Sequence, residues 1–119
     1  MTEETLATVR AYHEGWTSKR CAQAVRLLAP ALQVETPINS YPTTESFAQA
    51  VIAFGGMTRS VRLIAELASG AEAMLLYDMD VDGLGAMRVA EHFTVENGQI
   101  VRIRQIHDTH ALRAAGFGR

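Results

Sequence analysis

The chain has 119 residues, of which 48% are hydrophobic and 20% charged, so we expect residues 1–119 to form one globular domain. A net charge of −2 excludes the basic field that nucleic acid or an anionic membrane would need. Cys21 is the single cysteine, which excludes an intrachain disulfide and a cysteine-based zinc site.

The first residues, MTEETLATVR, are acidic and polar, whereas a signal peptide begins basic and continues apolar. The chain also has no run of about 18 apolar residues that would mark a membrane span. Together with the lone cysteine, these features lead us to expect a cytoplasmic protein with no nucleic-acid partner and no membrane partner.

Helical spacing marks the start of the chain. Leu6, Val9, His13 and Trp16 recur at the period of a helix, which predicts an amphipathic helix over residues 3–18 with Tyr12 on its flank. A second, shorter helix is predicted over residues 21–28, because Pro30 cannot supply a helical N–H and disfavours helix before it.

The middle of the chain predicts a brief strand and a third helix. Residues 32–36 alternate and form the strand, which Pro37 ends, and residues 38–42 form a loop. Thr43 or Thr44 can then cap a helix that Gly55-Gly56 closes.

From residue 60 onward the hydrophobic period changes to two, which is typical of strands. Turn residues at Gly70, Asp82-Gly83 and Asn97-Gly98 divide this part of the chain. The predicted strands are 60–69, 72–81, 86–96 and 99–108, and a helical turn around Leu112 precedes a loose end at 116–119. Helices followed by an antiparallel meander predict an α+β fold.

The last hairpin has the clearest register. Asn97-Gly98 predicts a two-residue type I′ turn, and regular pairing then places Glu91 opposite Arg104 and His92 opposite Ile103. Two faces follow from this pairing. One contains Arg88, Ala90, His92, Thr94, Val101, Ile103, Gln105 and His107, and its mixture of apolar and polar groups is typical of a pocket wall. The other contains Met87, Val89, Phe93, Val95, Ile100 and Ile106 with the Glu91–Arg104 pair, and is apolar enough to be buried.

The length of the loop at Asp82 decides which side chains of the preceding strand, residues 72–81, share a face with those of strand 86–96. A loop of two or four residues puts Tyr77 on the face of Ala90 and His92, and an odd loop would reverse this arrangement.

Three segments carry a family resemblance. They are the helix with Tyr12 and Trp16, the segment Val34-Glu35-Thr36-Pro37, and the closing hairpin VAEHFTVENGQIVRIRQIHD. Their order resembles the nuclear transport factor 2-like superfamily, which includes SnoaL-like polyketide cyclases and ketosteroid isomerases. The resemblance implies a cone-shaped, curved antiparallel or mixed sheet with three N-terminal helices packed over it and an apolar pocket between them. It also implies a homodimer through the outer sheet face, which the regular register assigns to Val89, Glu91, Phe93, Arg104 and Ile106.

Comparison with ketosteroid isomerase indicates that this chain lacks residues needed for the steroid isomerase reaction. That chemistry needs a carboxylate base and an oxyanion hole made by a tyrosine and a protonated aspartate. Tyr12 matches the tyrosine, but Thr36 stands at the position of the base and Ala90 near the position of the acid. Steroid isomerisation by that mechanism is therefore not expected.

Three candidate catalytic residues remain. Tyr12 is either a donor to a ligand oxygen or a helix-edge aromatic with its hydroxyl at the surface. His107 is either an acid or base near neutral pH or a structural histidine bonded to a carbonyl. Glu66 would be a base with a raised pKa if a two-residue turn at Gly70 directs it into the pocket.

We expect a pocket for a small, mostly apolar molecule and no metal or cofactor. If the protein is an enzyme, it transfers protons in the isomerisation, cyclisation or dehydration of a carbonyl compound, with His107 or Glu66 as base and Tyr12 or Tyr77 as polariser. A binding protein without turnover and a dimerisation module are the alternatives. The expected ligand-binding residues are Trp16, Thr36, Tyr41, Phe54, Tyr77, Ala90, His92, Ile103 and Gln105.

Overall fold

The computed structural model describes residues 2–117, which form four helices and one five-stranded sheet. The elements in chain order are α1 (Thr2–Thr17), α2 (Cys21–Val25), β1 (Leu28–Glu35), α3 (Thr44–Met57), β2 (Thr58–Ser69), β3 (Glu72–Val81), β4 (Gly85–Glu96), β5 (Gln99–His107) and α4 (His110–Ala114).

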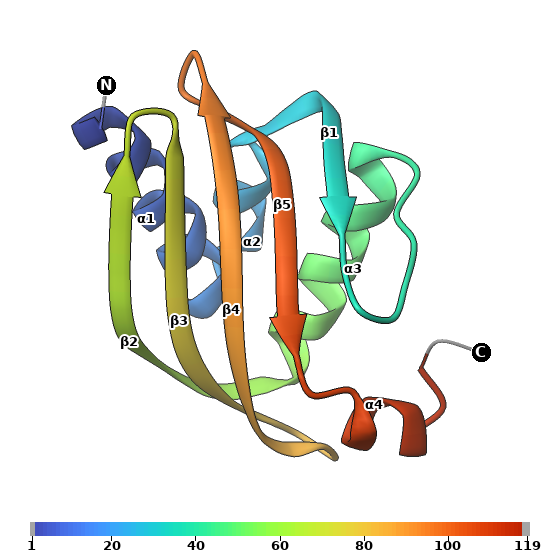
Figure 1. Ribbon diagram of the computed structural model, residues 1–119. Coiled ribbons are helices and arrows are strands. Elements are labelled where there is room, and N and C mark those ends of the chain that lie inside the picture. The colour runs from blue at the N-terminus through green and yellow to red at the C-terminus, as the bar shows by residue number, and fades with distance from the viewer. Residues whose placement is uncertain (1, 118–119) are drawn as a thin grey trace.

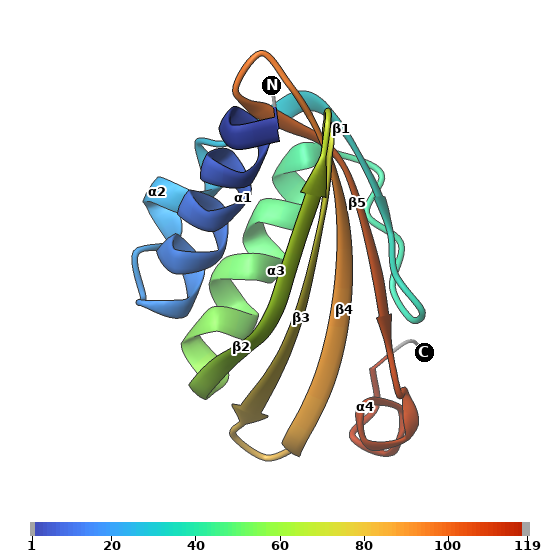
Figure 2. The same cartoon turned by 60° about the vertical axis from the view of Figure 1, so that its left-hand side comes forward.

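The sheet has the strand order β1-β5-β4-β3-β2. β1 runs parallel to β5, and all other neighbouring strands are antiparallel. The sheet is curved, and α1, α2 and α3 lie on its concave side (Figures 1 and 2). The expected α+β fold with a curved mixed sheet is thereby confirmed.

Hydrogen bonds at the start of α3 decide which threonine caps it. The Thr43 side chain accepts from the Ser46 N–H at 3.1 Å, and the Ser46 hydroxyl accepts from the Thr43 N–H at 3.2 Å, which forms a capping box. Thr44 instead donates its hydroxyl to the Ala29 carbonyl at 2.7 Å. Thr43 is therefore the cap, and Thr44 ties α3 to β1.

The second helix ends earlier than predicted, at Val25, and β1 begins at Leu28 rather than at residue 32. Leu28 is buried and pairs with Ile100 of β5. Pro30 fits in this strand because β1 is at the edge of the sheet, where a missing N–H leaves no ladder bond unmade. The helical turn around Leu112 is observed as α4, whereas the predicted loose end lies partly outside the described residues, at 118–119.

The pairing of β4 differs by one residue from the predicted register on both sides, toward β3 and toward β5. Val81 pairs with Gly85, so the loop before β4 has three residues and is odd. After the turn at Asn97-Gly98, Val95 pairs with Ile100 but Thr94 pairs with Arg102, which leaves Val101 as an extra residue in β5. Such a bulge reverses the alternation of faces beyond it.

As a result, each side chain of β4 lies on the face opposite to the one predicted from the sequence. The side chains of β3 and β5 that were predicted to share a face do share it. Glu91 pairs with Gln105 instead of Arg104. The prediction for β4 was therefore wrong: Ala90 and His92 lie on the convex face. The residues expected at an outer interface, Val89, Glu91 and Phe93, are buried on the concave face.

The convex face carries a row of apolar residues, which we call the outer apolar row. It crosses four strands in register and consists of Ala65, Leu76, Ala90 and Ile106. Ile106 is 69% exposed. Beside this row, Asp78 bonds to Arg88 at 2.7 and 2.9 Å and to Arg62 at 3.4 Å.

The core fills the space between α1, α3 and the concave face. Tyr12 of α1 packs edge-on against Phe93 of β4, with ring centroids 5.9 Å apart. Phe93 and Ile103 are fully buried. Close packing also joins α1 to α2, since a Cβ added to Gly15 would lie 2.9 Å from the Cβ of Ala24.

This contact predicts opposite effects for two glycine substitutions. Gly15→Ala should lower the free energy of unfolding by about 1 to 2 kcal/mol, because overpacking outweighs the gain in helix propensity. Gly56→Ala is the matched control: it lies in α3 with open space around it and should raise that free energy by up to about 1 kcal/mol. Urea denaturation measures both, and a stabilised Gly15→Ala variant would contradict the proposed packing.

Candidate functional site

A cavity of about 350 Å³ lies between the concave face of the sheet, α1, α3, the loop after β1 and the C-terminal segment. Its volume is at the lower end of the range for small-molecule sites. Most of its lining is apolar, including Met79, Met87, Val51 and Phe54. The sheet and helices thus border a mostly apolar cavity.

Glu91 is the only carboxylate that lines this cavity among residues 2–117. It is 1% exposed. The Tyr77 hydroxyl donates to Glu91 Oε1 at 2.6 Å, and Gln105 Nε2 donates to Oε2 at 2.9 Å. Burial raises the pKa of Glu91, and the two hydrogen bonds oppose that rise only in part.

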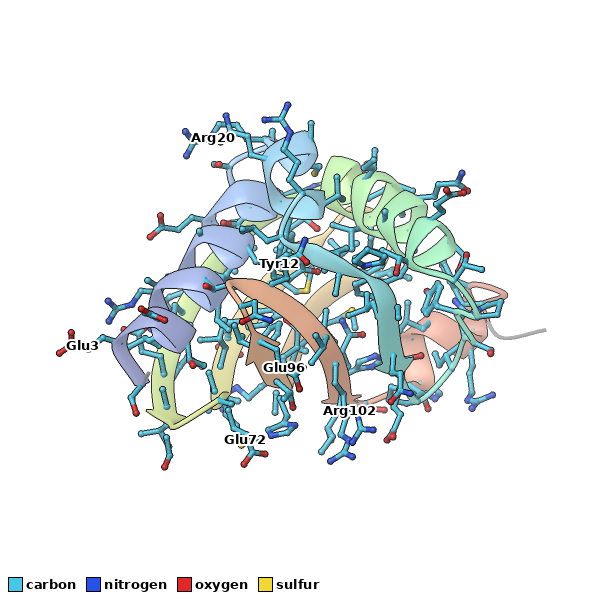
Figure 3. All side chains as sticks on the ribbon, turned by 90° about the horizontal axis from the view of Figure 1, so that it is seen from above. Glu3, Tyr12, Arg20, Glu72, Glu96 and Arg102 are labelled. Atoms are coloured by element: carbon cyan, nitrogen blue, oxygen red, sulfur yellow. The ribbon has the colours of Figure 1, made fainter. Side chains whose placement is uncertain are left out.

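Tyr12 contributes a second polar group to the buried end of the cavity. Its side chain lies between α1 and the sheet (Figure 3), is 1% exposed and lines the cavity. Burial, followed by the nearby Glu91 carboxylate, raises the pKa of Tyr12 well above its usual value. Within residues 2–117 its hydroxyl has no hydrogen-bond partner, so this neutral O–H is free to donate to a ligand.

The rings of His13 and Trp16 in α1 pack against the Tyr77 ring. His13 packs against Tyr77 with ring centroids 4.8 Å apart and against Trp16 at 5.4 Å. His13 is 6% exposed, and burial lowers its pKa to about 4. Its ring is therefore neutral at pH 7 and acts as part of the aromatic packing that fixes the Tyr77 hydroxyl.

The polar groups at the outer end of the cavity are less buried. Thr36 donates its hydroxyl to the Asn39 carbonyl at 2.7 Å, and Tyr41 packs against Phe47 at 5.3 Å. His107 is half-buried, and its Nδ1 lies 3.0 Å from the Asp108 carbonyl oxygen.

Eight of the predicted site residues line the cavity together, and four do not. Ile103 is part of the core, and Ala90 and His92 are on the convex face, where His92 bonds to Glu72 at 2.8 Å. Glu66 belongs to a separate site between α1 and β2. The eight residues in the cavity lining are Tyr12, Trp16, Thr36, Tyr41, Phe54, Tyr77, Gln105 and His107.

Glu66 lies on the concave face, as a two-residue turn at Gly70 predicts, since it pairs with Leu75 and Leu75 pairs with Glu91. The expectation was wrong in that Glu66 does not line the cavity and its pKa is not raised. The turn at Gly70 does have two residues, since Ser69 pairs with Glu72. However, β2 is the edge strand, and Arg10 of α1 donates to the Glu66 carboxylate at 2.9 and 3.0 Å. These bonds lower the pKa of Glu66.

Sequence reasoning missed Glu91 because it assumed a regular register. One signal was available in the sequence, namely glycines at positions 83 and 85. In the structure both have positive φ, at 81° and 85°, within and directly after the three-residue loop 82–84. No comparable signal marks Val101, because a bulge without glycine has no reliable sequence signature.

No group of three His, Cys, Asp or Glu side chains within residues 2–117 is arranged to hold a metal ion. No helix in the same range is long and apolar enough to cross a membrane.

A curved sheet that encloses an apolar pocket beneath helices defines a class of small α+β pocket proteins. The chain belongs to the SnoaL-like domain family, which it matches over residues 9–103.

Solved structures agree with this assignment. A Kribbella flavida DSM 17836 protein superposes with a TM-score of 0.86 at 25% identity, covering 92% of this chain and 91% of its own. A nuclear transport factor 2-like protein of Cytophaga hutchinsonii ATCC 33406 gives 0.81 at 15% identity, with 92% and 94% covered. A second Kribbella flavida DSM 17836 protein, provisionally named a ketosteroid isomerase, gives 0.80 at 18% identity, with 90% and 79% covered. These similarities establish the fold.

One curated relative is similar in sequence. It is an alanine racemase of Mycobacterium avium (strain 104), 32% identical over 82 residues, or 69% of this chain. The match spans only 21% of the racemase. The chain thus corresponds to about a fifth of that protein.

The buried His13 predicts a loss of stability in acid. Because its pKa falls from 6.5 unfolded to about 4 folded, its contribution is complete above pH 6.5 and declines as the pH falls to about 4. The full loss is about 3 kcal/mol. His13→Phe should remove this part of the pH dependence in urea titrations, and His110→Phe, at an exposed position, should not. Identical pH profiles for wild type and His13→Phe would refute the burial argument.

Proposed function

We propose that this protein is a cofactor-free acid–base catalyst that transfers a proton within an apolar carbonyl compound. The observation that carries the proposal is Glu91: a buried carboxylate with a raised pKa, hydrogen-bonded at the closed end of an apolar cavity. Raised carboxylate pKa values suit a group that must both take and return a proton near neutral pH.

In the proposed mechanism the ligand carbonyl oxygen accepts a hydrogen bond from Tyr12. The Glu91 carboxylate removes a proton from a carbon next to that carbonyl, and the electron pair moves onto the oxygen as an enolate. In a β,γ-unsaturated ketone the enolate is conjugated with the double bond, so return of the proton from Glu91 to the γ-carbon, with the electron pair moving back from the oxygen, completes an isomerisation. Tyr12 stabilises the enolate because its donor is already oriented in a site with little water.

Tyr77 and Gln105 hold the carboxylate in place for this step. They occupy one oxygen each, at 2.6 and 2.9 Å. The sequence comparison counted against acid–base chemistry partly because it placed Ala90 in the pocket. In the structure Ala90 is outside the cavity lining and the neighbouring Glu91 is part of it. The structural similarity to a provisionally named ketosteroid isomerase is consistent with the proposal.

No cofactor takes part in the proposed reaction. We further propose a cytoplasmic location, which the single free thiol of Cys21 supports because such thiols are typical of reducing compartments.

A ligand-binding protein without turnover is the second candidate. Thr36 has no acid or base function, and its hydroxyl is already bonded to Asn39. Both Glu91 oxygens also accept hydrogen bonds from the protein, as in a purely structural buried carboxylate. This candidate predicts ligand binding without proton exchange.

Proton exchange distinguishes these two functions. Wild type should exchange the α-hydrogens of 1-tetralone for deuterium, followed by NMR in deuterated buffer. Glu91→Gln should reduce the enzyme-dependent rate about 100-fold or more, since it removes the base. Tyr12→Phe should reduce it by a similar factor through loss of the oxyanion donor.

Glu96→Gln is the matched control, because it makes the same change at an exposed position of the same strand and should leave the rate unchanged. Binding of 1-tetralone by wild type without any exchange would favour the second candidate.

We also propose that the outer apolar row joins two copies of the chain as a homodimer. A second copy offers the same apolar row, and the flanking Arg62, Asp78 and Arg88 supply both signs of charge for complementary contacts. Of the five residues predicted for this interface, Ile106 belongs to the outer apolar row and Arg104 lies on the same convex face, where it pairs with His92.

A charge in the outer apolar row should therefore separate the copies. Ile106→Glu is expected to shift sedimentation velocity from dimer to monomer, because the interface would bury an unpaired carboxylate. Ile52→Glu, on an exposed part of α3, should leave the sedimentation coefficient unchanged. A wild-type monomer, or an Ile106→Glu dimer, would refute this interface.

A further inference from the structure

The cavity lining is mostly apolar and carries polar groups at its buried end and again at the half-buried His107. Its buried end holds Tyr12, Tyr77 and Glu91, each no more than 3% exposed. Met79 and Met87 belong to its apolar wall. His107 belongs to its outer end, where the side chain is half-buried. A ligand in this cavity can therefore meet hydrogen-bonding groups at two separate places.

Strand geometry gives the separation of the two polar places. Glu91 pairs with Gln105, and Val89 pairs with His107. All four residues line the cavity, so His107 lies one side-chain row away from the Glu91–Gln105 row. Two residues along a strand correspond to about 7 Å.

The hydrogen bond of His107 determines which ring nitrogen a ligand can use. A carbonyl oxygen only accepts, so His107 Nδ1 carries the hydrogen and donates it to Asp108. In the neutral imidazole Nε2 is then an acceptor, which matches a hydroxyl group on a ligand. Among residues 2–117, no Lys or Arg lines the cavity to pair with an anionic ligand group.

We propose that His107 is a specificity residue that accepts a hydrogen bond from a ligand hydroxyl about 7 Å from the carbonyl group bound near Glu91. The inference rests on the proposed function, since it takes the carbonyl to lie at Tyr12 and Glu91. It replaces the role of base considered for His107, because a base must reach the same carbon as the buried groups. The ligand class is a hydroxylated cyclic ketone with its two oxygens at opposite ends.

Binding of three matched bicyclic ketones tests this inference without turnover. Trp16 is the single tryptophan and lines the cavity, so its fluorescence reports occupancy. Wild type should bind 6-hydroxy-1-tetralone about 3- to 10-fold more tightly than 1-tetralone, which is the size of one neutral hydrogen bond. The 6-methoxy compound, which cannot donate, should show no such gain.

Substitutions of His107 connect the preference to this residue. His107→Phe keeps a planar ring without an acceptor and should abolish the preference, whereas His107→Gln retains an acceptor and should keep part of it. His110→Phe, in exposed α4, should bind as wild type does.

Three results would overturn the inference: equal affinity of wild type for the hydroxylated and unsubstituted ketones, an undiminished preference in His107→Phe, or no binding of any of the three. Its failure is distinguishable from failure of the proposed function. Hydroxyl preference without deuterium exchange contradicts catalysis alone, and exchange without hydroxyl preference contradicts the role of His107 alone.

Discussion

The alternation of side chains along β4 is the constraint on which the site depends. A strand can present only every second residue to the cavity, so one orientation buries Val89, Glu91 and Phe93 and the other buries Ala90 and His92. The odd loop before β4 and the extra residue Val101 in β5 select the first orientation. Two shifts of one residue therefore decide whether the cavity contains a carboxylate.

Burying a carboxylate is unfavourable unless its oxygens are hydrogen-bonded. Tyr77 and Gln105 meet this requirement, and they come from the strands on either side of β4. The same ladder that fixes the register thus positions both donors. Tyr77 is itself held by the rings of His13 and Trp16, so packing of α1 on the sheet also fixes the geometry around Glu91.

The fold and the chemistry have different physical origins in this chain. Apolar positions on the helices and strands specify the curved sheet and the cavity, and the structural relatives share the fold. Fold alone does not determine the reaction, which depends on a few polar side chains in the cavity. In the proposed function those side chains are Tyr12 and Glu91 at the buried end of the cavity and His107 at its half-buried part.

The sequence by itself determined the α+β fold and the alternation of side chains within each strand, because periodicity acts locally. Tyr12 lines the cavity, as its place beside the apolar stripe of the first helix allows. Tyr77 shares a face with Gln105 and His107 as predicted only because the two one-residue shifts on either side of β4 cancel. Only the tertiary structure decided the orientation of β4 and the pairing of Glu66 with Arg10. A bulge without glycine and an ion pair between residues 56 positions apart depend on contacts between distant segments, for which local sequence carries no signal.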